Sequence, residues 1–213
     1  MKITLTNAGK RFNREWIFHN LNYEFIPDIK YAITGPNGSG KSTLLQVVCS
    51  NLILNEGNCE WQLDSTNIQQ DNVHLYVSIA APYLELIEEM TAKEFLGFHN
   101  QFKNFIAGFS IDDILKEAGL YNAADKQIRF FSSGMKQRLK LAQAIFSDVP
   151  VVLLDEPCTN LDASGFELYY KWIEQYCNDR LFIISSNDKN EYSVCEREIN
   201  ILQYKKTKPI VHS

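Results

Sequence analysis

The chain has 213 residues, a length that predicts one domain, or one domain carrying an inserted subdomain. Its net charge of −5 argues against a nucleic-acid binder that relies on a basic face. It contains no run of about 18 apolar residues and no signal-peptide core, and its five cysteines lack metal-ligand spacing, so we expect a soluble chain with free thiols in a reducing cytoplasm.

The N-terminal segment is predicted to form an antiparallel β layer. Residues 2–6 and 17–25 alternate apolar and polar side chains, as strands do, and residues 7–10 read as a turn between them. Phe12 and Trp16 are candidates for exposed aromatic side chains that stack on a purine. Packing at the edge of the β layer is the alternative, and composition does not separate the two.

A phosphate-binding loop follows an apolar run at residues 31–33 and precedes a helical stretch at residues 44–48. Two glycines separated by four residues, and then Lys and Ser, form the pattern in the strand–loop–helix context that it requires. A chance Lys-Ser pair after a glycine-rich turn is the alternative, and it does not explain the flanks. Lys41 would reach the terminal phosphates, and the Ser42 hydroxyl would bind Mg²⁺. The predicted nucleotide-binding residues of this loop are Gly35, Pro36, Asn37, Gly38, Ser39, Gly40, Lys41, Ser42 and Thr43.

The middle of the chain is predicted to leave the sheet and become helical. Residues 55–58 read as a turn, residues 59–63 and 73–77 as strands, and residues 64–72 as a polar loop. Thr91 and Glu94 have the spacing of a capping box, and a second helix begins at Ser110 and ends at Gly119. We therefore expect a helical subdomain over about residues 83–135, inserted into an α/β core of about residues 1–82 and 136–213.

The last third of the chain repeats a βαβ rhythm. Helices are predicted over residues 134–147 and 162–177, and strands over residues 151–154, 181–185 and 199–202. The fold class is therefore α/β, a mostly parallel core sheet of the P-loop NTPase type with an N-terminal antiparallel β layer.

Two acidic residues follow the apolar strand at residues 151–154. Carboxylates at the C-terminal edge of a core parallel strand lie where ligands bind in open α/β sheets. Asp155 would hold Mg²⁺, directly or through water, and Glu156 would polarise the water that attacks the γ-phosphate.

With these residues in place, the chain resembles the nucleotide-binding subunit of ABC (ATP-binding cassette) transporters over essentially its whole length. The family's order and spacing are kept by the loop at residues 35–43, Phe131-Ser132-Ser133-Gly134-Met135, Leu153-Leu154-Asp155-Glu156-Pro157 and Thr159-Asn160-Leu161-Asp162. The resemblance implies a head-to-tail pair of such domains, each ATP lying between the phosphate loop of one and the signature segment of the other. Ser132 and Gly134 would then contact the γ-phosphate of the partner's ATP, residues 160–162 would face the opposite site, and Phe12 would stack on adenine.

Three positions depart from the family's pattern. The signature normally reads Leu-Ser-Gly-Gly-Gln, but the contacting positions Ser132 and Gly134 are kept. Ala80 stands where the family has a Gln that touches Mg²⁺ and the attacking water, and alanine can do neither. Asn187 replaces the family's catalytic His, and its amide can hydrogen-bond a γ-phosphate but cannot carry a proton. We therefore expect ATP binding with slower hydrolysis, or altered coupling to a partner.

The resemblance also implies the partners. The leading hypothesis is an ATPase that pairs with a second nucleotide-binding subunit, as a homo- or heterodimer, and drives a separate transmembrane permease subunit from the cytoplasmic face of the membrane. Residues 82–90 would be its docking surface, with simple packing of the helical subdomain as the alternative. A soluble ATPase of the same family and an ATP-gated clamp with little hydrolysis are the competing hypotheses.

Overall fold

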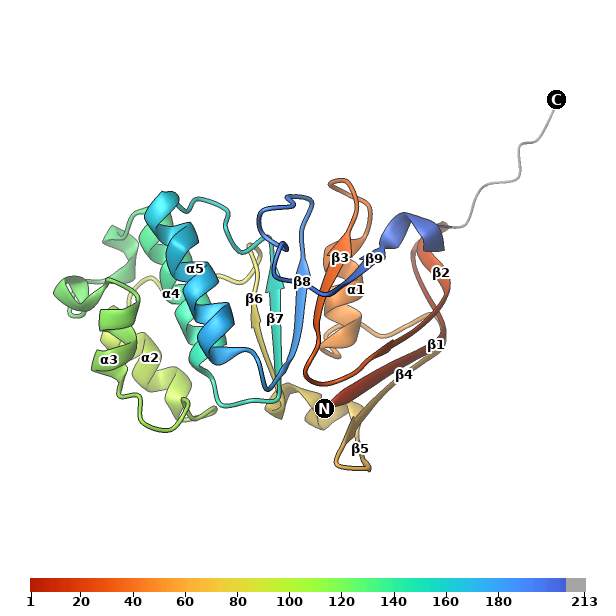
Figure 1. Cartoon of the computed structure of the whole chain (residues 1–213), viewed down its shortest axis with the longest axis horizontal. Helices are drawn as coiled ribbons and strands as arrows, with labels where there is room; N and C mark the ends of the chain where they lie inside the picture. Colours follow the sequence, from red (N-terminus) through yellow and green to blue (C-terminus); the bar gives the residue numbers. More distant parts are fainter. Residues whose placement is uncertain (206–213) are drawn as a thin grey trace.

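Two β-sheets enclose one helix in the computed structural model, which describes residues 1–205 (Figure 1). The antiparallel sheet has the strand order β2-β1-β4-β5, and the parallel sheet has the order β6-β7-β8-β3-β9. The antiparallel strands are β1 (Lys2–Phe12), β2 (Glu15–Phe25), β4 (Glu56–Leu63) and β5 (Thr66–Ile68). The parallel strands are β3 (Lys30–Thr34), β6 (Val77–Ala80), β7 (Val151–Asp155), β8 (Leu181–Ser185) and β9 (Arg197–Asn200). This is the α/β fold with an N-terminal antiparallel layer that the sequence predicts.

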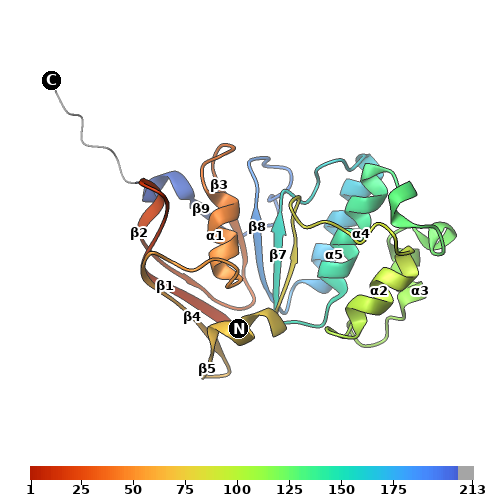
Figure 2. The same ribbon diagram turned by 180° about the vertical axis from the view of Figure 1, so that it is seen from behind.

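The helices lie on opposite faces of the parallel sheet, as the front and back views show (Figures 1 and 2). Helix α1 fills the space between the two sheets, whereas the other four helices form a layer beyond the second face. The helices are α1 (Lys41–Val48), α2 (Ala92–Asn100), α3 (Ile111–Glu117), α4 (Ser133–Phe146) and α5 (Ala163–Tyr176). Short 3₁₀ turns are η1 (Gln70–Leu75), η2 (Tyr121–Ala123), η3 (Ile128–Phe130) and η4 (Ile201–Tyr204).

Alternate residues of the central strands belong to two separate hydrophobic cores. Val151 and Leu153 of β7 pack with α1 and the antiparallel sheet, and Val152 and Leu154 pack with the outer helix layer. All five residues of β7 and of β8 are buried. A parallel strand covered on both faces needs an unbroken apolar run, and this is why residues 151–154 identify it in the sequence.

The predicted helix starts are confirmed. Thr91 and Ser110 each accept a hydrogen bond from the backbone N–H three residues on, and Glu94 and Asp113 complete the two capping boxes. Gly119, just beyond α3, has a φ of 63°, the left-handed conformation that ends a helix at little cost in glycine.

The predicted turn at residues 7–10 is wrong. Strand β1 runs through it, and the pairing with β2 slips in register between Leu5 and Ala8 and again before Lys10. Asn7 has a φ of 47°, and its N–H donates to Asn22 Oδ1 over 2.8 Å. The turn-forming residues therefore build a β-bulge, which bends a long strand instead of ending it.

Three other sequence boundaries need correction. Strand β4 already begins at Glu56, inside the predicted turn at residues 55–58, because Gly57 adopts a φ of 74° within the strand. Residues 70–75 form the 3₁₀ turn η1 instead of the predicted strand at residues 73–77. Val73 is apolar because it is fully buried, and not because it belongs to a strand. The last strand is β9 (Arg197–Asn200), and Ile201 already starts a 3₁₀ turn.

The five cysteines and the helices lie within residues 1–205, the described part of the chain. All five cysteines are free, and within this range no three His, Cys, Asp or Glu side chains gather as a metal site would require. None of the helices described is both long and apolar enough to cross a bilayer. Residues 206–213 of the predicted domain lie outside the described part of the chain.

Replacing Gly97 by alanine should stabilise the protein. A Cβ at this position in α2 would meet only Ile111 Cδ1, at 3.7 Å, which is an ordinary contact. The substitution removes glycine's backbone entropy cost within a helix, so the free energy of unfolding should rise by about 0.5–1 kcal/mol in urea titrations. Gly119→Ala is the matched control and should lower it, because the φ there is 63°. Equal shifts in both variants would contradict this assignment.

Candidate nucleotide-binding site

The loop after β3 has the backbone shape of a phosphate cradle. Gly35 and Gly40 have φ values of 145° and 109°, and the Ser39 N–H donates to Pro36 O over 3.0 Å. A Cβ on Gly40 would lie 2.2 Å from Ile17 Cγ2, so this residue must be glycine both for its conformation and for the close approach of β2. Gly40 caps α1, whose first N–H groups therefore point into the loop.

Lys41 lies inside this cradle with its ammonium group against the loop. The residue is 4% exposed, and Nζ donates to Gly35 O over 3.0 Å and to Pro36 O over 3.4 Å. Glu156 Oε1 lies 3.9 Å from the same Nζ. The structure thus brings together the predicted phosphate-binding lysine and the predicted catalytic carboxylate, which stand 115 positions apart in the chain (156 − 41).

Asp155 is buried at the C-terminal end of β7. It is 2% exposed, and its Oδ1 makes no hydrogen bond with any residue that the structure describes. Leaving a buried carboxylate oxygen without a partner is costly, and a bound cation removes that cost. Together with the Ser42 hydroxyl in the first turn of α1, Asp155 supplies hard oxygen ligands that fit Mg²⁺. The Ser39 Oγ in the cradle is likewise buried and unbonded among the described residues.

Glu156 is held in a strained conformation directly after the strand. Its φ is 44°, an uncommon value for a residue with a side chain, and its N–H donates to Ser185 O over 2.8 Å. The half-exposed carboxylate consequently turns toward Lys41 instead of continuing the strand. Strain of this kind persists only when its surroundings enforce it, and it is frequent at functional sites.

Asn187 follows the end of β8, the strand that lies between β7 and β3 in the parallel sheet. Its Nδ2 donates to Asn37 Oδ1 over 2.9 Å, which ties the loop after β8 to the phosphate loop. Its neighbour Ser186 donates to the carboxylate of the buried Glu191, which also accepts the Cys158 N–H over 3.0 Å. Burial raises the pKa of Glu191, and the hydrogen bond from Ser186 counteracts part of that rise.

Sequence reasoning missed two of these supporting groups. Glu191 fastens the segment after Glu156 to the segment after β8, and the Gln137 Nε2 of α4 donates to Pro157 O over 2.6 Å. Neither residue belongs to a recognisable motif, and only their burial, at 6% and 9% exposed, distinguishes them. A buried polar side chain without a motif cannot be identified from one sequence.

Ser132 and Gly134 are not brought to the phosphate loop of their own chain. Ser132 caps α4 and accepts the Met135 N–H over 3.2 Å, and α4 lies across the parallel sheet from α1 (Figure 1). A Cβ on Gly134 would lie 3.1 Å from Asn160 O, so the signature segment packs closely on the segment that follows β7. Within one chain these residues form a separate surface.

Phe12 stands at the end of β1, where the hairpin approaches the phosphate loop. It is 46% exposed and pairs with Glu15, two residues before the Ile17 that packs on Gly40. Trp16, the other aromatic candidate, lies edge-on to His19 with ring centroids 4.6 Å apart. Edge packing therefore accounts for Trp16, whereas the partly exposed Phe12 ring lies under the Lys10 ammonium, 5.3 Å from the ring centroid.

Comparison with known proteins gives a consistent result. The family model described as "ABC transporter" matches residues 18–159. The uncharacterized ABC transporter ATP-binding protein YybJ of Bacillus subtilis (strain 168) is 28% identical over 91% of this chain and 89% of its own length. The cytochrome c biogenesis ATP-binding export protein CcmA of Nitrosococcus oceani is 30% identical over 79% of this chain and 77% of its own. The dimeric structure of MJ0796, a bacterial ABC transporter cassette, superimposes with a TM-score of 0.79 at 24% identity, covering 93% of this chain and 94% of that one.

Asp155→Asn should abolish the effect of Mg²⁺ on ATP affinity without lowering the free energy of unfolding. An amide costs less to bury than an unpaired carboxylate, so the free energy of unfolding without metal should stay constant or rise by about 1 kcal/mol. The Mg²⁺-dependent gain in ATP affinity should disappear, as measured by calorimetric titration with and without Mg²⁺. Asp179→Asn, an exposed residue before β8, should alter neither quantity. A variant that kept the full Mg²⁺ effect would remove Asp155 from the metal site.

Proposed function

This chain belongs to the ABC transporter family of ATP-binding proteins, whose members are ATPases, and we propose that it binds and hydrolyses Mg-ATP to power transport by a separate membrane-spanning subunit. The observation that carries the proposal is the convergence of Lys41, Asp155 and Glu156 at one edge of the parallel sheet. No other cluster among the described residues combines a phosphate cradle with carboxylates at strand ends.

In this proposal, each group of the site contacts a different part of Mg-ATP. Backbone N–H groups of residues 35–43 and the start of α1 donate to the phosphates, and Lys41 exchanges its loop carbonyls for phosphate oxygens. Mg²⁺ held by Ser42 and Asp155 would neutralise charge on the β- and γ-phosphates. Glu156 would accept the proton of the attacking water, and Asn187 would hydrogen-bond the γ-phosphate while anchored to Asn37.

A head-to-tail dimer would complete the site. Ser132 and Gly134 lie on a helix N-terminus that has no phosphate within its own chain to bind, and a helix N-terminus with a hydroxyl beside it suits an anion. We propose that this surface closes on the nucleotide of a second copy or a related subunit. MJ0796, a cassette with the same fold, was solved as a dimer.

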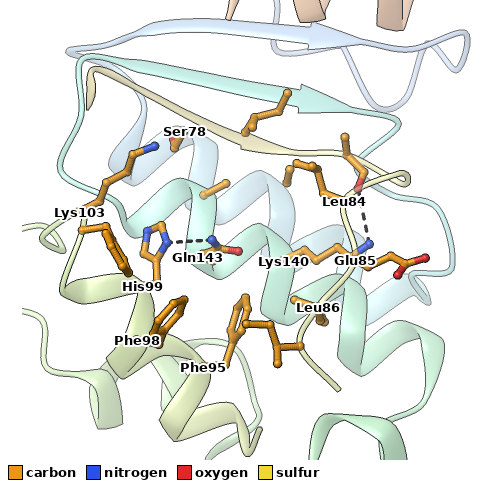
Figure 3. A pocket seen from close by; sticks show the side chains of 16 residues that line it. Ser78, Leu84, Glu85, Leu86, Phe95, Phe98, His99, Lys103, Lys140 and Gln143 are labelled. Atoms are coloured by element: carbon orange, nitrogen blue, oxygen red, sulfur yellow. Dashed lines mark hydrogen bonds between the residues drawn. The ribbon is translucent and has the colours of Figure 1, made fainter. Parts of the chain in front are cut away.

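A groove beside the site would receive the membrane subunit. It has a volume of about 370 Å³ and lies between the end of β6, the segment that follows it, α2 and α4 (Figure 3). Phe98, Phe102 and Ile87 line it and are 42%, 67% and 39% exposed, which is unusual for large apolar side chains. This groove contains the residues 84–87 of the predicted docking surface at residues 82–90.

The polar groups of the groove fit a partner with an acidic residue. His99 accepts a hydrogen bond from Gln143 Nε2 over 2.9 Å (Figure 3). Its other ring nitrogen lies 2.8 Å from Ser147 Oγ, so both ring nitrogens are engaged. Burial lowers the pKa of His99 to about 4, which keeps the ring neutral at pH 7. Lys103 donates to Val77 O over 2.6 Å, and burial lowers its pKa. An amphipathic helix of a permease, carrying a carboxylate for Lys103, would match this lining, and the chain would then act at the inner face of the membrane.

We further propose that about residues 83–135 move as a helical subdomain against a RecA-like core of about residues 1–82 and 136–213. Helices α2 and α3 pack on α4, whereas Gln137 of α4 is bonded to Pro157 beside the catalytic strand. A change at the γ-phosphate could thereby reach the groove. An ATP-gated clamp with little hydrolysis is the second candidate, and Ala80 and Asn187 favour it.

Phosphate release from Mg-ATP should rise more steeply than in proportion to protein concentration. Composite sites form only in the dimer, so the turnover per chain should increase until dimerisation is complete. Glu156→Gln should lower turnover at least about a hundredfold while ATP binding persists. Strictly proportional turnover would contradict the composite site, and tight ATP binding without turnover at any concentration would favour the clamp.

Ile87→Ser should release the chain from the membrane fraction of its own source cells. Ile87 lines the groove, so a polar side chain there should remove apolar contact with the permease. Ile53→Ser is the matched control, because Ile53 is 72% exposed and does not line this groove. Quantitative immunoblotting of membrane and soluble fractions makes the comparison. Equal membrane retention of both variants would count against the groove as the docking site.

A further inference from the structure

The residues just before α2 are bonded to η3, the 3₁₀ turn that leads into the signature segment. The Ile128 N–H donates to Met90 O over 2.9 Å, and the Arg129 N–H donates to Glu88 O over 3.0 Å. An isolated antiparallel bridge between Thr91 and the residue before η3 continues this pairing. Residues 88–91, which we call the strap, therefore lie along the backbone that enters the signature segment.

A side-chain ion pair fastens the strap to α4 itself. Lys136, the fourth residue of α4, donates from Nζ to the Glu88 carboxylate. Glu88 thus holds the chain on both sides of the signature segment, through its backbone carbonyl before it and through its carboxylate after it.

The position of Lys136 on α4 gives the pair an electrostatic reason. A cation in the first turn of a helix is unfavourable, because the N-terminal end of the helix dipole is positive. The first turn of α4 carries no acidic residue that would offset it. Glu88 supplies the missing negative charge from outside the helix.

The ion pair spans open space between the strap and α4. A cavity of about 440 Å³ lies there, and Glu88 and Lys136 both line it, together with Ser133 of the signature segment and Asn160 of the segment after β7. Apolar packing cannot fix the distance between two surfaces that a cavity separates. On this side of α4 the two charged side chains hold that distance instead.

We propose that Glu88 is a positioning residue for the signature surface formed by Ser132 and Gly134. Through Lys136 it holds the start of α4 in the orientation in which that surface meets the nucleotide of a second subunit. The inference rests on the proposed head-to-tail dimer. Glu88 does not itself touch the nucleotide in this arrangement, and it acts only through Lys136.

Glu88→Ala tests the proposal because it removes the carboxylate and leaves the backbone bonds of the strap. In the Glu156→Gln background, which conserves ATP, sedimentation velocity with saturating Mg-ATP measures the dissociation constant of the dimer. A fluorescent ATP analogue measures nucleotide affinity at protein concentrations below dimerisation. The dissociation constant should rise about three- to tenfold, because each dimer contains two such pairs and an exposed ion pair is weak, while nucleotide affinity should change less than about twofold.

Lys136→Met separates positioning from a direct contact of either charge with the second subunit. If the two residues act as one pair, the double variant should shift the dissociation constant of the dimer no further than the larger of the two single shifts. Additive shifts would overturn the positioning role, since each charge would then act independently.

Glu117→Ala is the matched control. Glu117 of α3 pairs with Lys171 of α5 over 2.8 Å, a partly exposed ion pair in the same layer of helices, so its loss should leave the dissociation constant of the dimer unchanged. An unchanged constant in Glu88→Ala, or an equal rise in Glu117→Ala, would overturn the proposal and leave the proposed function intact. A parent chain that binds ATP but forms no dimer would overturn the head-to-tail arrangement itself, so the two failures are distinguishable.

Discussion

Burial of the parallel sheet on both faces is the constraint on which the rest of the structure depends. Strands β7 and β8 are apolar at every position before their last residue, because one face packs on α1 and the other on α4 and α5. Polar chemistry is therefore excluded from the strands and concentrated at their C-terminal ends. All strands of this sheet run parallel, so these ends meet at one edge, and the phosphate loop, Asp155, Glu156 and the loop with Asn187 necessarily become neighbours.

This edge carries groups that the fold alone would not favour. Asp155 has a buried oxygen without a hydrogen bond in the described part of the chain, and Glu156 has a left-handed backbone. In proteins generally, each of these features lowers the free energy of unfolding by about 1–3 kcal/mol. The two apolar cores and supports such as Glu191 hold these residues in place. A site that pre-arranges unpaired oxygens and a lysine gains affinity for a metal–polyphosphate ligand, since the ligand satisfies groups that are already ordered.

The predictable part of this protein is the part encoded in local spacing. The phosphate loop, the capping boxes at Thr91 and Ser110 and the apolar strand before Asp155 each depend on fewer than about ten consecutive residues, and they are found where the sequence places them. The segments at residues 7–10 and 73–77 were mispredicted because tertiary context decides them. Residues 7–10 form a bulge that the pairing with β2 imposes. Residues 70–75 form a 3₁₀ turn, and its Val73 is buried in the hydrophobic core between the two sheets.

The two departures at Ala80 and Asn187 have different physical consequences. Asn187 has a polar link to the phosphate loop through Asn37, and its amide cannot carry a proton. Glu156 Oε1 lies 3.9 Å from Lys41 Nζ, and we propose this carboxylate as the acceptor of the proton from water. At Ala80 the polar group itself is lost from the strand end, because alanine has no side-chain donor or acceptor. Ala80 also lines the groove beside α2 and α4, so this departure lies where the end of β6 meets the groove.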